Sequence, residues 1–202
     1  MKISKIEPQK KNRNRSSVYI NGNFAFGLSN EVLVRFDLHE GDEIDDDTIN
    51  NILFESEKQM VRLRAFRLLR YRVRSAEELR TRLVRTGFDQ EIVAAVIAEL
   101  VGDKTIDDEH FARAYIADHT ALKPKGNIFV RRELARLGVP ADTIERAMSE
   151  RDERSIVEQY LRKKLGALDL KDPKDRSKAI RRLLMRGFTP GVVYDVIGEH
   201  EK

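Results

Sequence analysis

The chain contains the ten-residue stretch LRTRLVRTGF at residues 79–88, and its pattern returns twice without gaps. The second copy is VRRELARLGV at residues 130–139, and the third is AIRRLLMRGF at residues 179–188. The glycines of the copies are spaced 51 and then 49 residues apart: Gly87, Gly138 and Gly187. A period of about 50 residues is typical of a tandem array in which each repeat buries its apolar surface against its neighbours.

Local signals predict that each copy is the middle helix of a three-helix repeat. The glycine stands where a helix C-terminus needs a left-handed residue, a conformation that glycine adopts without a Cβ penalty. Ser75 and Glu78 match a capping box, and Asp175 takes the corresponding N-cap position in the third copy. Pro190 suits the first turn of the helix that follows. A further helix is expected before each copy, at residues 61–74, 108–119 and 154–165.

The N-terminal quarter of the chain has a different pattern. Residues 1–15 hold six Lys or Arg and few apolar groups, which predicts a mobile arm. Asn21-Gly22 lies between alternating aromatic and β-branched residues, which is a strong signal for a β-hairpin. Residues 31–38 favour a short helix, and the run Asp45-Asp46-Asp47-Thr48 is suited to cap the next one.

The sequence therefore predicts a mainly α fold: a tandem array of three three-helix repeats, preceded by a small N-terminal module with a β-hairpin. The predicted boundaries are 1–57 for the N-terminal arm, hairpin and short helices, 58–106 for repeat 1, 107–153 for repeat 2 and 154–202 for repeat 3.

Composition excludes several classes of protein. The 202 residues include no Cys, which excludes a disulfide framework, a thiolate metal site and a cysteine nucleophile. No apolar run reaches the roughly 18–20 residues that span a bilayer, and the N-terminus lacks the apolar core of a signal peptide. We therefore expect a cytoplasmic protein with no membrane partner.

Motifs that would support catalysis are missing from the sequence. The segment GNFAFG at residues 22–27 has the glycines of a P-loop, but Leu28 stands where the lysine is required. The histidines are dispersed and match no metal-ligand spacing: His39, His110, His119 and His200. No nucleophile–base pair is evident. We expect no catalytic residue, no metal and no cofactor, and hence a protein that is not an enzyme.

The positive charge is concentrated in two blocks. Residues 61–88 contain nine basic and two acidic residues, a net charge of +7. Residues 154–186 contain 11 basic and four acidic residues, again +7. The whole chain carries only +4, because acidic segments separate these blocks. Such blocks are typical of a surface that binds a polyanion or an acidic protein, although basic runs are also often solvated helix faces.

Helical spacing within the first block places an apolar arc (Val61, Ala65, Phe66, Leu68, Leu69 and Val73) opposite a basic stripe. Arginine stripes suit phosphates and carboxylates, because the guanidinium presents a planar fork of donors. The alternative is that the arginines pair with acids on adjacent helices. The candidate contact residues of the chain are Arg64, Arg67, Arg70, Arg74, Arg82, Arg85, Arg131, Arg132, Arg162, Lys163, Lys164, Arg181, Arg182 and Arg186.

The middle of the chain resembles a known family. The residues that carry the resemblance are IDDEHFARAY at 106–115, Lys125-Gly126 and RELARLGV at 132–139. They are similar to the central block of RecX, the bacterial regulatory proteins of the RecA recombinase. The resemblance covers residues 60–202, and the hairpin module resembles extensions that only some members have.

The resemblance implies a non-enzymatic protein that binds the groove of the RecA–DNA filament. It implies inhibition of the RecA ATPase and of strand exchange in homologous recombination, DNA repair and the SOS response. We expect a monomer. The alternative function is direct binding to single- or double-stranded DNA by the two arginine-rich blocks.

Overall fold

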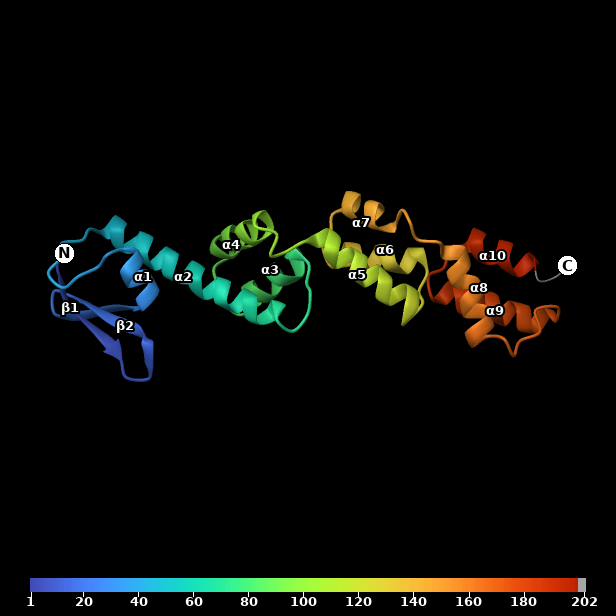
Figure 1. The fold of residues 1–202 in the computed structure, drawn as a ribbon, viewed down its shortest axis with the longest axis horizontal. Coiled ribbons are helices and arrows are strands. Elements are labelled where there is room, and N and C mark those ends of the chain that lie inside the picture. Colours follow the sequence, from blue (N-terminus) through green and yellow to red (C-terminus); the bar gives the residue numbers. More distant parts are fainter. Residues whose placement is uncertain (200–202) are drawn as a thin grey trace. The chain divides into compact units, whose positions relative to one another are not determined.

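The structure is a computed structural model, and it describes residues 1–199 of the chain (Figure 1). The chain divides into two compact units, one made of Met1–Tyr71 with Arg80–Glu99, the other of Arg72–Leu79 with Leu100–Lys202. The elements of the described residues, in order, are β1 (Ile3–Gln9), β2 (Asn12–Ile20), β3 (Asn23–Ser29), α1 (Asn30–Arg35), α2 (Asp46–Leu69), α3 (Ala76–Arg85), α4 (Gln90–Gly102), α5 (Asp108–Ala121), α6 (Asn127–Arg136), α7 (Ala141–Met148), α8 (Glu153–Lys164), α9 (Pro173–Met185) and α10 (Pro190–Glu199).

The fold is mainly α with a small N-terminal sheet, which confirms the predicted fold class. The predicted hairpin joins β2 and β3, where Asn21 and Gly22 have φ values of 49° and 84°. Both residues are therefore in the left-handed region that a type I′ turn requires. One face of the sheet buries Ile3, Val18 and Leu28 completely, and these side chains form a core with residues of α1 and of the start of α2.

The predicted N-terminal arm was wrong, because residues 3–9 and 12–20 form strands β1 and β2. The antiparallel sheet has the order β1-β2-β3. The exposed Lys5 pairs with Glu7, while Ile3 points into the core. An irregularity in the strand register between Ile3 and Lys5 interrupts the alternation of faces, so Ile6 also packs against the core. A count of basic residues does not reveal such a strand.

Helix α2 replaces two elements of the sequence analysis, a helix beginning near Asp45 and a separate helix over residues 61–74. The predicted cap is confirmed, since the Asp45 side chain accepts the Thr48 N–H at 2.8 Å. The helix then continues for 24 residues and crosses the expected boundary at residue 57. Ile52 and Val61 are both fully buried although nine residues, or 180° of helical rotation, separate them.

The two halves of α2 therefore pack on opposite sides. Ile52 belongs to the core of the N-terminal sheet. The second half faces α4, where Glu99 accepts a hydrogen bond from Lys58 at 2.7 Å and also pairs with Arg62. The Lys58 ammonium lowers the pKa of Glu99 below its usual value of 4.5.

Each of the later repeats has the three expected helices and a core of its own. Helices α5 to α7 bury Phe111, Val130, Leu134 and Ile144 in one cluster. Helices α8 to α10 bury a second cluster that includes Val157, Leu183, Phe188 and Val193. The glycine after the middle helix of each copy has a positive φ, as predicted: 96° for Gly87 and 77° for both Gly138 and Gly187. Pro190 opens α10, which also agrees with the sequence.

The predicted N-cap Asp175 was wrong, because α9 begins earlier. Asp172 is the N-cap, and its side chain accepts the N–H groups of Lys174 at 3.1 Å and Asp175 at 2.9 Å. Pro173 occupies the first helical position, where it needs no hydrogen-bond partner. The Arg176 N–H, which would be unsatisfied in a helix capped by Asp175, donates to the Asp172 carbonyl at 3.0 Å.

Contacts between successive repeats recur within the second compact unit. Asp108, at the start of α5, accepts the Ala76 N–H at the start of α3 at 2.9 Å. Glu153, at the start of α8, accepts the Asn127 N–H at the start of α6 at 2.6 Å. At the later contact Gly126 donates to the Arg186 carbonyl at 3.0 Å. The first helix of a repeat thus caps the middle helix of the repeat before it.

Candidate functional site

Three of the predicted arginines form an exposed stripe along the second half of α2. Arg64, Arg67 and Arg70 are spaced by three residues, so they lie on neighbouring turns. Arg70 lies 180° from the buried Val61. Arg85, the last residue of α3, is exposed as well. None of these four makes an ion pair with another residue of the described chain.

Arg74 does not belong to this stripe, so this part of the prediction was wrong. Its side chain is 8% exposed and pairs with Glu78, which also binds Arg72. The reason is that α2 ends at Leu69 and the chain turns before Arg74, whereas the prediction extended the helix to residue 74. Arg82, on α3, is exposed.

The predicted apolar arc is confirmed only in part. Val61 and Ala65 are fully buried, whereas Phe66 is 42% exposed and Val73, beyond the end of the helix, is 43% exposed. The arc of α2 that is buried against the first repeat therefore includes fewer residues than the sequence predicted.

The candidates of the second repeat are engaged in ion pairs. Arg131 makes two hydrogen bonds to the Glu145 carboxylate, at 2.9 and 3.0 Å, which raise the pKa of Arg131. Arg132 lies 3.8 Å from Glu133 and 5.6 Å from the centre of the Phe129 ring. Arg131 and Arg132 thus pair with acidic residues of the same repeat, which was the alternative to a role in binding a partner.

The third repeat supplies a second group of exposed cations. Arg162, Lys163 and Lys164 are exposed in the last turn of α8, where positive charge is also favourable for the helix dipole. Arg181 and Arg182 are exposed on α9. Within the described chain these five side chains make no ion pair.

Arg186 has a structural role. It is half-buried, donates from Nε to the Pro124 carbonyl at 3.0 Å, and stacks over the Tyr160 ring at 4.8 Å. It therefore joins α9 to the loop before α6 and to α8, and it is not available as a surface contact.

The stretch at residues 106–115 also turns out to stabilise the fold. Asp107 is the N-cap of α5 and accepts the N–H groups of Glu109 at 2.8 Å and His110 at 2.9 Å, which lowers its pKa. Burial raises the pKa of the neighbouring Asp108, which caps α3. Arg113 pairs with Glu109 one turn along the helix at 3.0 Å.

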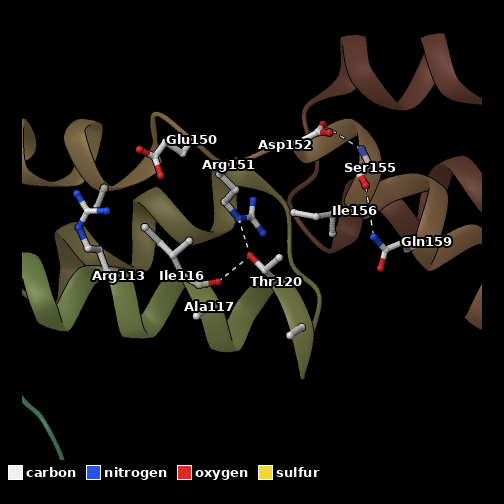
Figure 2. Close-up of a pocket in the computed structure, with 12 residues that line it drawn as sticks. Arg113, Ile116, Ala117, Thr120, Glu150, Arg151, Asp152, Ser155, Ile156 and Gln159 are labelled. Carbon is white, nitrogen blue, oxygen red and sulfur yellow. Dashed lines mark hydrogen bonds between the residues drawn. The ribbon is translucent and has the colours of Figure 1, made fainter.

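A groove of about 500 Å³ lies between α5, α7 and α8 (Figure 2). Ile116 and Ile156 contribute apolar surface to it, and Arg113 and Glu150 lie at one side. Arg151, a residue that could not be singled out from the sequence, also lines the groove.

Four of the five N–H groups of the Arg151 guanidinium are engaged. Its guanidinium donates to Thr120 Oγ1 at 3.1 Å, to the carbonyls of His119 at 3.2 Å and Lys125 at 2.6 Å, and to Asn127. Burial lowers the pKa of Arg151. Its partners are 24 to 32 residues away, so no local sequence signal could have identified it. The residue therefore fastens the loop before α6 to the end of α5.

No group of three potential metal-ligating side chains is present within residues 1–199. His200, one of the four histidines considered, lies outside the described residues. The same part of the chain contains no helix that is both long and apolar enough to cross a membrane.

Family models match three parts of the chain. The model of the regulatory protein RecX N-terminal domain matches residues 1–45, and those of the first and second RecX three-helix domains match residues 62–100 and 107–148. The N-terminal sheet module is therefore matched as well as the first two helical repeats.

Regulatory proteins of several bacteria match this chain over nearly its whole length. The chain is 34% identical to regulatory protein RecX of Bacillus velezensis over 196 residues, which is 96% of this chain and 74% of that protein. It is also 34% identical to RecX of Bacillus subtilis over 201 residues, with the same coverage, and 32% identical to that of Halalkalibacterium halodurans over 205 residues, covering 98% and 77%.

Two solved structures share the fold. A crystal structure of regulatory protein RecX superposes with a TM-score of 0.76, 25% identity and 98% coverage of both chains. The crystal structure of RecX from Lactobacillus salivarius has a TM-score of 0.60 and 18% identity, and covers 72% of this chain and 97% of that one.

Proposed function

The chain belongs to the RecX family of regulatory proteins, and we propose that it binds the RecA–DNA filament and inhibits the RecA ATPase and strand exchange. It would act in the cytoplasm as a non-enzymatic monomer, in homologous recombination, DNA repair and the SOS response. One observation carries the proposal beyond the family name: nine of the fourteen candidate contact residues are exposed and make no ion pair within residues 1–199. They are Arg64, Arg67, Arg70, Arg85, Arg162, Lys163, Lys164, Arg181 and Arg182.

These side chains fall in two separate repeats of the array. A partner that is itself a repeating assembly can contact several such groups at once, so weak individual contacts add up to a useful affinity. Arginine forks fit carboxylates on a protein as well as phosphates on DNA, and a recombinase filament presents both.

The proposal is tested by removing the charges of the first group. In the variant Arg64→Gln/Arg67→Gln/Arg70→Gln/Arg85→Gln we expect inhibition of the RecA ATPase to weaken at least tenfold. The matched control removes four exposed charges that already have acidic partners: Arg113→Gln/Arg136→Gln/Arg146→Gln/Arg154→Gln. The control has the same net charge and should inhibit like the wild type. The proposal would be abandoned if stoichiometric wild-type protein left ATPase and strand exchange unchanged.

The second candidate function is direct DNA binding, which the same unpaired arginines favour. Arg64, Arg67 and Arg70 on successive turns could each meet a backbone phosphate. This function predicts affinity for DNA in the absence of RecA, with a steep loss as salt is raised, because each phosphate contact releases counterions. A DNA affinity that is undetectable, or insensitive to salt, would exclude it.

A further inference from the structure

The exposed side of α2 is not only basic. Four large apolar side chains are interleaved with its arginines: Met60 is 39% exposed, Leu63 53%, Phe66 42% and Tyr71, just beyond the helix, 86%. We call these four residues, together with Arg64, Arg67 and Arg70, the mixed α2 face. At 100° per residue Met60, Leu63, Phe66, Arg67 and Arg70 lie on the side away from Val61 and Ala65. Arg64 lies at the edge of this side, and Tyr71 follows the end of the helix.

The apolar members of the mixed α2 face are not part of the core at this end of the helix. Val61 and Ala65 fill that role and are completely buried. Leu63 and Phe66 lie on the other side and keep roughly half of their surface in water. Contiguous exposed apolar groups that fold stability does not require are typical of interaction surfaces.

The composition of the face indicates which kind of partner covers it. Arg, Met, Tyr and Phe are enriched at the centres of protein–protein interfaces, where the aromatic and aliphatic groups enter pockets. A nucleic-acid strand can stack bases on Phe66 or Tyr71, but it offers no pocket for the aliphatic Met60 and Leu63.

The arginines of the mixed α2 face indicate that the partner's surface carries carboxylates. The sequence from residue 58 to residue 76 contains no Asp or Glu. Arg64, Arg67 and Arg70 find no acidic partner in the described chain either. Complementary carboxylates must therefore come from the partner, at the rim of whatever apolar groove receives Leu63 and Phe66.

We propose that the mixed α2 face docks, as a helix, into an acidic-rimmed apolar groove on the RecA protein of the filament, and not on its DNA. The inference rests on the proposed function and names a surface of this chain that would contact RecA. It is an instance of helix-in-groove recognition, in which apolar anchors on neighbouring turns give affinity and flanking charges give orientation.

The test separates the apolar groups from the charges. Leu63→Ser/Phe66→Ser keeps every arginine, whereas Arg67→Gln/Arg70→Gln keeps every apolar group. The matched control Val34→Ser/Leu122→Ser removes two other exposed apolar side chains, 79% and 75% exposed, that lie outside the face. Tyr71→Ser is added because a side chain that is 86% exposed can be removed without risk to the core. Circular dichroism checks that each variant is folded.

Two affinities are measured for every variant, one for preassembled RecA filaments on single-stranded DNA and one for the naked DNA. We expect Leu63→Ser/Phe66→Ser to lose at least tenfold, and Tyr71→Ser about threefold, in filament affinity, with DNA affinity within twofold of the wild type. The Val34→Ser/Leu122→Ser control should keep both affinities.

Two results would overturn the inference alone. In the first, the apolar variants bind filaments like the wild type, which itself binds well. In the second, filament and DNA affinities fall together, which would make the face a stacking surface for nucleic acid. A wild-type protein that does not bind filaments at all would instead refute the proposed function, and the inference with it.

Discussion

Glu153, the buried first residue of α8, accepts the backbone N–H of Asn127, the first residue of α6, at 2.6 Å. The same carboxylate oxygen accepts the Thr189 N–H at 3.2 Å, so one side chain satisfies the starts of two helices. One repeat earlier, the Asp108 side chain in the same way accepts the N–H of Ala76 at the start of α3. A carboxylate is well suited to this position because the N-terminus of a helix carries partial positive charge and unpaired N–H groups.

Replacement of Glu153 should weaken this contact measurably. We expect Glu153→Ala to lower the free energy of unfolding by about 1–3 kcal/mol, because it leaves two partly buried backbone donors without acceptors. Hydrogen exchange of the Asn127 and Thr189 amides should accelerate more than that of amides in α5. Glu150→Ala, at an exposed acid with no ion pair in the described chain, is the control and should change stability by less than about 0.5 kcal/mol.

Gly126 should tolerate no side chain. A Cβ at this position would overlap the Gly187 carbonyl and the Phe188 N–H group. We expect Gly126→Ala to destabilise the protein by about 1–3 kcal/mol through overpacking. Gly102→Ala is the control, because open space surrounds the last residue of α4 and alanine is the better helix former. Chemical denaturation of both variants measures the difference, and equal stabilities would contradict the packing described here.

The true start of α9 can be tested with two aspartates. Asp172→Ala should cost about 1 kcal/mol, because it removes the side chain that caps Lys174 and Asp175. Asp175→Ala should cost less, because in the described chain that side chain accepts the Asp169 N–H of the preceding loop and caps no N–H of the helix. Thermal unfolding of the two variants compares the costs. The reverse order would place the helix start where the repeat alignment alone suggested.

The ion pairs of Glu99 give a pH dependence of known sign. Its pKa is lowered in the folded state, so the stability that it contributes is fully present above its usual value of 4.5 and is lost as the pH falls through the lower, folded value. We expect Glu99→Gln to be less stable than the wild type at pH 7, with the difference closing below pH 4.5. Urea unfolding across this range is the measurement. Glu43→Gln, an exposed acid outside any ion pair of the described residues, should show no such convergence.

Features with a local cause could be predicted from the sequence. The Asn21-Gly22 turn and Gly138, the glycine that ends α6, need left-handed backbone conformations that few residue types adopt. The residue type at these positions therefore predicts the local backbone conformation. The three-helix repeats were recognisable for the same reason, because each copy carries its own cap and glycine.

Features set by distant residues could not be predicted. The burial of Arg74 follows from the end of α2 at Leu69, for which the Arg- and Leu-rich sequence holds no stop signal. Arg131 was a candidate contact residue only because its partner Glu145, 14 residues away, was unknown. Nine of the fourteen candidate residues are exposed and make no ion pair in the described chain. Internal contacts instead engage Arg74, Arg131, Arg132 and Arg186.

The opposed buried faces of α2 have a consequence for folding cooperativity. Ile52 and Val61 belong to one continuous helix, so the N-terminal sheet and the first helical repeat cannot lose their cores independently. Unfolding of either core frays α2, and the other core loses part of its packing as a result. The 24-residue helix therefore couples the unfolding of the N-terminal sheet to that of the first repeat. Removal of the sheet module would leave the surface around Ile52 in water, so a truncated chain should melt earlier in its first repeat as well.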